Sequence, residues 1–137
     1  MKKFIIKKAI RKDAFNLSKL DNIANKEFEI WSKQTRKDFE KSISSRMFVF
    51  LIAYLNDNPV GYIESEFDIS KDIVWIKNIF LIQEFRKKGI AKKLISICSR
   101  YWKNKTNLLI LLTADRNLKI FEKLGFKKTM NYMVKKI

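Results

Sequence analysis

The hydrophobic pattern changes twice between residues 73 and 113, and this limits the possible folds more than any other feature of the sequence. IVWIKNIFLI (residues 73–82) is an apolar run typical of a β-strand. From Ile90 to Trp102 the apolar residues recur at helical spacing, with basic residues on the other faces. LLILLT (residues 108–113) has no alternation and predicts a strand covered on both faces, which is typical of parallel pairing. The order strand, helix, strand therefore predicts one βαβ unit.

The residues before this unit predict a first strand, two helices and an antiparallel meander. FIIKKAI (residues 4–10) has the composition of a strand, and Asp13 is a favourable N-cap for the helix that follows it. A second short helix is expected over residues 36–45, with Phe39 and Ile43 on its inner face. The apolar residues expected on one side of the first helix are Ala14, Leu17, Leu20 and Ala24. The meander strands are expected at residues 46–55, 60–67 and 73–82, with a turn at 56–59.

The end of the chain predicts one more helix and a last strand. DRNLKIFEKLGF (residues 115–126) has the pattern of a helix stopped by Gly125, and KKTMNYMVKKI (residues 127–137) has that of a strand. The element order becomes β-α-α-β-β-β-α-β-α-β. We therefore expect a single α/β domain over residues 1–137, in which helices flank a central, mostly antiparallel sheet that contains one parallel βαβ unit.

The composition excludes several classes of protein. A chain of 137 residues that is 47% hydrophobic can build a core, and none of its apolar runs approaches the roughly 18–20 residues of a membrane span. The apolar run that follows the basic N-terminus is too short for a targeting segment. There is one cysteine, Cys98, expected as a buried structural thiol, and no histidine, so neither a disulfide framework nor a metal site is expected. We expect a soluble, reduced, cytoplasmic protein, either monomeric or homodimeric.

The net charge of +16 is compatible with nucleic acid, an anionic surface or acidic ligands as partners. Of the 30 basic residues, however, only six are arginines, whose planar fork reads guanine and phosphate. Interleaved aromatic and basic residues are not evident either. The lysine excess is more typical of a compositional bias, so nucleic-acid binding is a minor alternative.

EFRKKGIAKKL (residues 84–94) places Gly89 among lysines, where a predicted strand gives way to a predicted helix. The first N–H groups of a helix have no internal partners and carry the positive end of the helix dipole. A glycine at this junction permits φ > 0 and lets the main chain approach a ligand. The segment therefore predicts an anion site, with phosphate as the expected anion. The alternative is a helix start with a basic exposed face, and the segment is neither a Walker A loop nor G-x-G-x-x-G.

RKKGIA (residues 86–91) resembles the (Q/R)-x-x-G-x-(G/A) signature of the GNAT superfamily of N-acetyltransferases. IFEKLGFKK (residues 120–128) resembles the later LYEKLGF segment of that family. The opening strand and helix and the NDNPVGYIES hairpin are also similar, so the resemblance spans essentially the whole chain in order. It implies an acyl-CoA N-acyltransferase-like fold and transfer of an acetyl group from acetyl-CoA to a primary amine of a peptide, protein or small molecule. The main alternative is a non-catalytic acyl-CoA-binding module of the same fold.

The resemblance also implies where acetyl-CoA would lie. In the family, the coenzyme occupies a cleft where the strand before the signature splays from the next parallel strand. Its diphosphate accepts hydrogen bonds from the signature loop, and its pantetheine arm pairs with the strand, where a main-chain N–H near Leu81 would face the thioester oxygen. The residues implied in coenzyme binding are Ile79, Phe80, Leu81, Arg86, Lys87, Lys88, Gly89, Ile90, Ala91, Lys92, Asn117 and Phe121.

A general base must accept the proton of the attacking amine. Glu64 and Glu66 are the best candidates, because they lie two apart on a predicted strand and share a side with Tyr62. The alternative is that both carboxylates face solvent. Asn78 and Trp31 are the expected contacts to the acceptor. The charge of +16 favours acidic acceptors, such as an acidic peptide, over polycations such as aminoglycosides.

Two positions depart from the family pattern. The tyrosine that usually precedes EKLGF and protonates the leaving thiolate is Phe121 here, and an asparagine often found seven residues earlier is Ala114, with Asn117 one turn along. Phe121 is instead expected to contact Phe126 in a Schellman motif that ends its helix at Gly125. Catalysis is still possible, because a thiol with a pKa of about 8.5 leaves readily as a thiolate.

Overall fold

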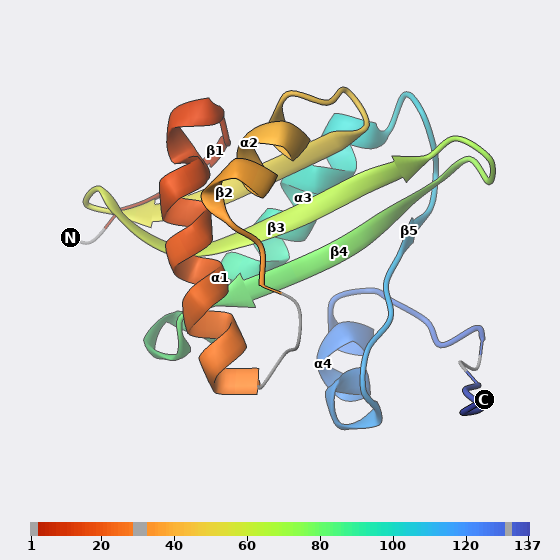
Figure 1. The fold of residues 1–137 in the computed structure, drawn as a ribbon. Helices are drawn as coiled ribbons and strands as arrows, with labels where there is room; N and C mark the ends of the chain where they lie inside the picture. The colour runs from red at the N-terminus through yellow and green to blue at the C-terminus, as the bar shows by residue number, and fades with distance from the viewer. Residues whose placement is uncertain (1–2, 29–32, 131–132) are drawn as a thin grey trace.

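The computed structural model of the chain describes residues 3–28, 33–130 and 133–137 and contains one mixed sheet flanked by helices (Figure 1). Within these ranges the strands lie in the order of the sequence, and only the pairing of the last two is parallel, which confirms the predicted fold class. The strands are β1 (Phe4–Lys8), β2 (Phe48–Leu55), β3 (Asn58–Asp68), β4 (Ile73–Leu81) and β5 (Leu109–Ile110). The helices are α1 (Ala14–Phe28), α2 (Arg36–Ile43), α3 (Ile90–Trp102) and α4 (Leu118–Lys123), with 3₁₀ turns η1 (Arg11–Asp13), η2 (Gln83–Phe85) and η3 (Asp115–Asn117).

The hairpin between β2 and β3 closes through a two-residue turn. Asn56 and Asp57 both have positive φ, 49° and 71°. Two consecutive residues in this region are characteristic of a type I′ turn, and Asn and Asp adopt it more readily than other non-glycine residues. The predicted turn was longer, because Asn58 and Pro59 already belong to β3.

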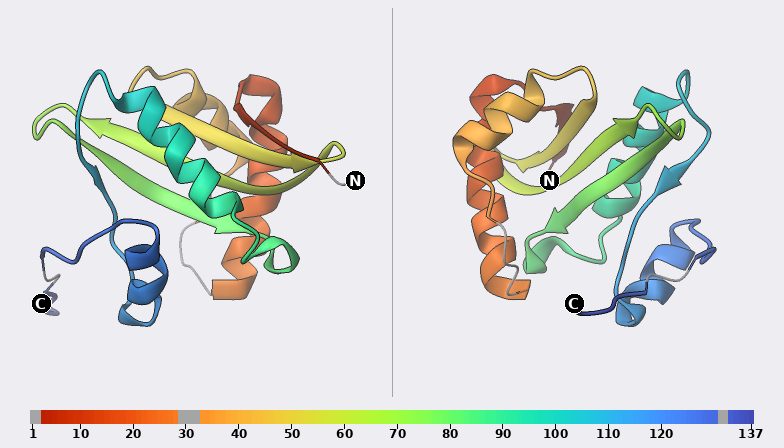
Figure 2. Two further views of the ribbon diagram at one scale, coloured as in Figure 1. Left: turned by 180° about the vertical axis from the view of Figure 1, so that it is seen from behind. Right: turned by 45° about the vertical axis from the view of Figure 1, so that its right-hand side comes forward.

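Helices cover both faces of the sheet (Figure 2). The core on one face lies between the sheet and α3, and the core on the other lies under α1 and α2. Each fully buried side chain of the size of leucine or phenylalanine stabilises the fold by roughly 1.5–3 kcal/mol. Residues of the first core include Leu51, Ile63, Val74, Leu94, Cys98 and Trp102, and those of the second include Leu17, Leu20, Phe39, Phe50, Ile52 and Tyr62.

Asp13 does not act as the N-cap that the sequence suggested. The helical backbone begins one turn earlier, in η1, of which Asp13 is the last residue. Its buried carboxylate accepts hydrogen bonds from the Ile10 main-chain N–H at 2.8 Å and the Tyr54 hydroxyl at 2.7 Å, and it lies 3.3 Å from Nζ of Lys7. Burial raises the pKa of this carboxyl, but the hydrogen bonds and the Lys7 cation outweigh burial and hold the pKa below its usual value.

Asp13→Asn is expected to lower the free energy of unfolding by about 1–3 kcal/mol at neutral pH, because hydrogen bonds to a charged group are lost. The folded-state pKa of Asp13 is depressed, so its ionised form contributes stability above the unfolded pKa of about 3.9. That contribution disappears as the pH falls through the folded-state pKa. Urea denaturation at several pH values should therefore show the difference between wild type and variant shrinking below about pH 4. A difference that is independent of pH would show that the charge of Asp13 contributes nothing.

The segment after α3 departs from the prediction of a strand that is covered on both faces. β5 has only two residues. Leu109 and Leu111 pack against the core beside α3, whereas Leu108 and Leu112 are exposed. The run LLILLT therefore packs against the core through the partly buried Leu109 and Leu111, and the expectation of two covered faces is wrong.

The predicted C-terminal strand is also wrong for the residues that the structure describes. Within 127–130 and 133–137 no strand forms, and the side chains of Met130, Met133 and Val134 are exposed. This segment runs apart from the strands (Figure 2). A strand requires a partner edge, and β5, the last strand at this end of the sheet, is too short to provide one.

Candidate active site

β4 and β5 diverge soon after they meet (Figure 1). Their parallel pairing joins only Val74 to Leu109 and Trp75 to Ile110. β4 continues as far as Leu81, so beyond Trp75 its edge has no strand partner on that side within the described ranges. Such an edge presents unpaired main-chain N–H and C=O groups and can take up an extended ligand as an added strand.

The N–H groups along this open edge alternate in direction. The Ile82 N–H donates to the Val60 carbonyl of β3 at 2.9 Å. Directions alternate along an antiparallel ladder, so the N–H of Phe80 also faces β3, whereas those of Ile79 and Leu81 face away from it. Two of the three predicted pantetheine contacts are therefore directed to the open edge.

The turn before α3 holds two residues in the left-handed region. Gly89, the N-cap of α3, has φ 85° and ψ 4°, which confirms the predicted positive φ, and Lys87 has φ 63°. A lysine in this region is strained by roughly 1–2 kcal/mol, and strain of this kind is common at binding loops. The first helical bond joins the Lys93 N–H to the Gly89 carbonyl at 3.2 Å, so the N–H groups of residues 90–92 have no helical acceptor. A Cβ built on Gly89 would meet no heavy atom within 4 Å, so these amides border open space.

The side chain of Arg86 links this turn to α1 and β4 through hydrogen bonds. Its guanidinium donates to both carboxylate oxygens of Glu27, at 2.6 and 2.7 Å, and its Nε donates to the Leu81 carbonyl at 2.9 Å. The guanidinium also lies 5.5 and 5.6 Å from the ring centroids of Phe28 and Phe80. The hydrogen bonds from Arg86 lower the pKa of Glu27. The side chain of Arg86 is thus engaged by protein groups, so its contribution to coenzyme binding would be indirect.

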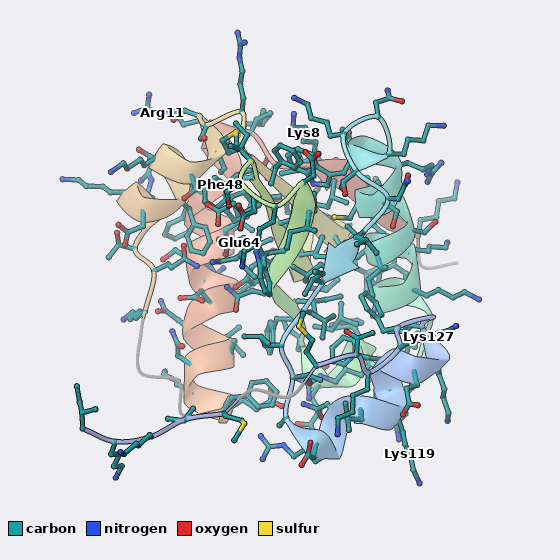
Figure 3. The ribbon with its side chains drawn as sticks, turned by 90° about the vertical axis from the view of Figure 1, so that its right-hand side faces the viewer. Lys8, Arg11, Phe48, Glu64, Lys119 and Lys127 are labelled. Carbon is teal, nitrogen blue, oxygen red and sulfur yellow. The ribbon has the colours of Figure 1, made fainter. Side chains whose placement is uncertain are left out.

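Glu64 lies on the face of β3 that α1 and α2 cover (Figure 3). Its side chain is buried, with 4% of the residue exposed. Oε1 accepts two side-chain amides, Nε2 of Gln34 and Nδ2 of Asn78, each at 3.0 Å. Glu66 lies two residues further along β3 and shares this face, as predicted. The alternative that both carboxylates face solvent is therefore wrong for Glu64.

Glu66 has a different environment at the rim of the same face. Its carboxylate lies 3.6 Å from Nζ of Lys77, and its side chain is 32% exposed. Lys77 stands next to Asn78 at an irregularity in the pairing of β3 and β4. A cavity of about 590 Å³ opens beside this ion pair and is also lined by Trp75 and Leu112. The structure therefore distinguishes a buried, hydrogen-bonded carboxylate from a partly exposed, ion-paired one.

Asp21 is a buried carboxylate that connects Gln34 to the sheet, and the sequence did not predict this role. Asp21 of α1 is 6% exposed and accepts the main-chain N–H of Gln34 at 2.9 Å and the Tyr62 hydroxyl at 3.3 Å. Burial, followed by the charge of Asp21, raises the pKa of Tyr62 far above its ordinary value, so this hydroxyl stays protonated. The signal in the sequence was a carboxylate four residues after Leu17, on the apolar stripe of the helix.

The end of α4 confirms the predicted Schellman motif. Gly125 has φ 98°, its N–H donates to the Glu122 carbonyl at 3.0 Å, and the Phe126 N–H donates to the Phe121 carbonyl at 3.0 Å. The rings of Phe121 and Phe126 meet edge to face with centroids 5.9 Å apart. Phe121 therefore has a structural role and offers no acidic group.

Three further residues that the sequence analysis named are Asn117, Cys98 and Trp31. Asn117 ends η3, one helical turn before Phe121. Cys98 is buried in the core beside α3, and burial raises the pKa of its thiol. Trp31 lies outside the described residues.

Across residues 3–28, 33–130 and 133–137, no three Cys, Asp or Glu side chains are grouped so as to hold a metal ion. No helix of the described ranges is both long enough and apolar enough to span a membrane.

The fold and the open edge of β4 define an acyl-CoA N-acyltransferase-like protein. A sequence model of the acetyltransferase (GNAT) domain matches residues 46–128, which is more than half of the chain. The chain belongs to the GNAT acetyltransferase family. No curated protein sequence matches it significantly.

Solved acetyltransferases share the whole fold. Aminoglycoside N-acetyltransferase AAC(6')-Iy in complex with CoA is 19% identical, with a TM-score of 0.84 over 100% of this chain and 96% of that chain. Glucosamine-6-phosphate N-acetyltransferase from Arabidopsis thaliana is 17% identical, with a TM-score of 0.78 over 98% of each chain. Ribosomal-protein-alanine N-acetyltransferase from Brucella melitensis biovar Abortus 2308 is 19% identical, with a TM-score of 0.76 over 98% of this chain and 100% of that chain. At these identities the similarity establishes the fold and leaves the acceptor open.

Proposed function

We propose that the protein transfers the acetyl group of acetyl-CoA to a primary amine. The observation that carries the proposal is that two features meet at one end of the βαβ unit: the open edge of β4, and the unpaired amides that follow Gly89. An open strand edge suits the amide-bearing pantetheine arm, and a helix N-terminus suits the diphosphate. CoA carries both chemical groups in one molecule. The similar AAC(6')-Iy binds CoA, which supports the proposal.

The coenzyme would be held mainly by the main chain. Diphosphate oxygens would accept hydrogen bonds from residues 87–92, where Gly89 leaves space and Lys88 and Lys92 add mobile positive charge. The pantetheine amides would pair with the main chain of β4 at Ile79, whose N–H faces the open edge, and the N–H of Leu81, which faces the same way, would lie toward the thioester oxygen.

The reaction proceeds by attack of a neutral amine on the thioester carbonyl carbon. The N–C bond forms, the C–S bond breaks, and CoA leaves as a thiolate. The N–H of Leu81 would stabilise the oxyanion, and Glu64 would accept the proton from the amine, directly or through water. Phe121 has no proton to give, so the thiolate takes its proton from solvent.

The acceptor would enter on the face of the sheet that carries Glu64. The cavity of about 590 Å³ lies beside Glu66 and Lys77, with Glu66 two residues from Glu64 along β3, and would provide space for part of it. Asn78 directs its amide to Glu64, so any contact of Asn78 with the acceptor would be secondary. The charge of +16 favours acidic acceptors, but one structurally similar acetyltransferase binds the aminoglycoside sisomicin, so both kinds of acceptor have to be tested.

Phe121 favours a second candidate function, a module that binds acyl-CoA without turning it over. The side chain at this position is occupied in the Schellman contact with Phe126 and cannot donate a proton. Loss of a general acid typically costs about 10²–10⁴-fold in rate, which can reduce turnover to a negligible level.

Thermal-shift and thiol-release assays with the same protein test both candidates. CoA should raise the melting temperature, because a ligand that binds only the folded state stabilises it. Acetyl-CoA should release free thiol in the presence of an amine from a panel of sisomicin, glucosamine 6-phosphate, a peptide with N-terminal alanine and an acidic peptide. Stabilisation without amine-dependent thiol release would favour the binding module. No stabilisation by CoA or acetyl-CoA would contradict both functions.

A further inference from the structure

Gln34 lies just before α2, on the face of the sheet that carries Glu64, and it is anchored through both its main chain and its side chain. Its main-chain N–H donates to Oδ2 of buried Asp21 at 2.9 Å. Its side-chain Nε2 donates to Oε1 of Glu64 at 3.0 Å. The other oxygen of Asp21 accepts the hydroxyl of Tyr62 from β3. Gln34 thus bridges α1 and β3 at a fixed position.

The side-chain amides of Gln34 and Asn78 both donate hydrogen bonds to the same carboxylate oxygen of Glu64, Oε1. Asn78 approaches from β4 and Gln34 from the segment before α2, so Oε1 is held from two sides. No donor in the described part of the chain reaches Oε2 within hydrogen-bond distance. The two carboxylate oxygens are therefore chemically distinct in this structure.

We infer that Gln34 is a positioning residue for acetyl transfer: together with Asn78 it fixes Glu64 through Oε1 and leaves Oε2 as the oxygen that takes the acceptor's proton. This inference rests on the proposed function. The terminal torsion of a glutamate is broad, so an unrestrained carboxylate samples many orientations. Two hydrogen-bond donors on Oε1 fix the plane of the carboxylate, and this gives the lone pairs of Oε2 a single direction. Proton transfer requires that kind of fixed geometry.

A purely structural role for Gln34 is the competing explanation, since the same bonds also anchor the segment before α2. Gln34→Leu removes the amide donor at similar side-chain size. Asn16→Leu is the matched control, because the Asn16 amide donates to the Tyr54 hydroxyl at 3.0 Å, is also partly buried, and does not touch Glu64. If Gln34 positions Glu64, its variant should lower kcat by about 10- to 100-fold and leave the KM for acetyl-CoA unchanged. Asn16→Leu should lower the melting temperature without changing kcat.

Exchanging the side chains of residues 34 and 64 tests whether the hydrogen bond between them stabilises the fold or positions the carboxylate. In Gln34→Glu/Glu64→Gln, residue 64 donates and residue 34 accepts, so a hydrogen bond between them is restored with the carboxylate moved off β3. The exchange should recover the melting temperature lost in Gln34→Leu but not the lost kcat. Recovery of kcat together with the melting temperature would overturn the inference.

The value of kcat is measured in two reactions: hydrolysis of acetyl-CoA, in which water is the acceptor, and acetyl transfer to sisomicin. Crystal structures of the variants are determined as well. Glu64→Gln is measured in parallel. If Glu64→Gln is slow and Gln34→Leu is not, the inference is wrong while the proposed base stands. If neither variant is slow, the base assignment and the inference both fail. In the crystal structure, Gln34→Leu should show the Glu64 carboxylate rotated or in several orientations. An unchanged carboxylate would overturn the inference even if no turnover is detected.

Discussion

Gly89→Glu is expected to raise the Kd for CoA by on the order of 100-fold or more, to the point where thermal shift no longer detects binding. The new side chain would occupy the open space in front of the α3 amides, where a Cβ meets no protein atom within 4 Å. It would bring a negative charge to the place proposed for the diphosphate. It would also strain the turn, because Gly89 has φ 85°. Calorimetric titration of CoA into the variant measures this effect.

The matched control is Gly125→Glu. Gly125 also has a positive φ, 98°, and also has no heavy atom within 4 Å of a built Cβ, but it ends α4 rather than beginning α3. Both variants should lose about 1–2 kcal/mol of stability through backbone strain. Only the variant at Gly89 should lose CoA affinity. Equal loss in both would trace the effect to destabilisation and place the phosphate site elsewhere.

Glu64→Gln is expected to lower kcat by about 10²–10⁴-fold, with the Kd for acetyl-CoA unchanged. The substitution keeps the size of the buried side chain and removes its capacity to accept a proton. Single-turnover thiol release with acetyl-CoA and an active amine measures the rate, and titration of acetyl-CoA measures the affinity separately.

Glu66→Gln is the comparison that the structure supplies for this variant. Glu66 is partly exposed and paired with Lys77, and an exposed ion pair contributes only about 0–1 kcal/mol. Its substitution should change kcat less than tenfold. A larger loss at Glu66 than at Glu64 would reverse the assignment of the base.

The parts of the fold that depend on local pattern were predictable from the sequence. The spacing of apolar residues from Ile90 to Trp102 predicted α3 with the bounds that the structure shows, and the glycine before it predicted a positive φ. The contact of Phe121 with Phe126 followed from the geometry of helix ends. In each case the residues that determine the structure lie within one or two turns of one another.

The parts that depend on distant partners were not predictable. The residues after α4 have a strand-like pattern, but a strand forms only against an edge that is long enough, and β5 is not. Gln34 belongs to a connection without periodicity, and its partners Asp21 and Glu64 are far away in the chain and meet only in the folded protein. The sequence placed Glu64 on the same face of its strand as Tyr62 but could not show that two amides hold one of its oxygens.

A crystal structure of the protein with CoA would show whether the turn before α3 and the open edge of β4 hold the coenzyme. We expect diphosphate oxygens within about 2.7–3.2 Å of main-chain N–H groups in residues 87–92, and a pantetheine arm beside Ile79 and Leu81. A diphosphate bound elsewhere, for example on the lysines of the outer face of α3 with the space before Gly89 empty, would contradict this expectation.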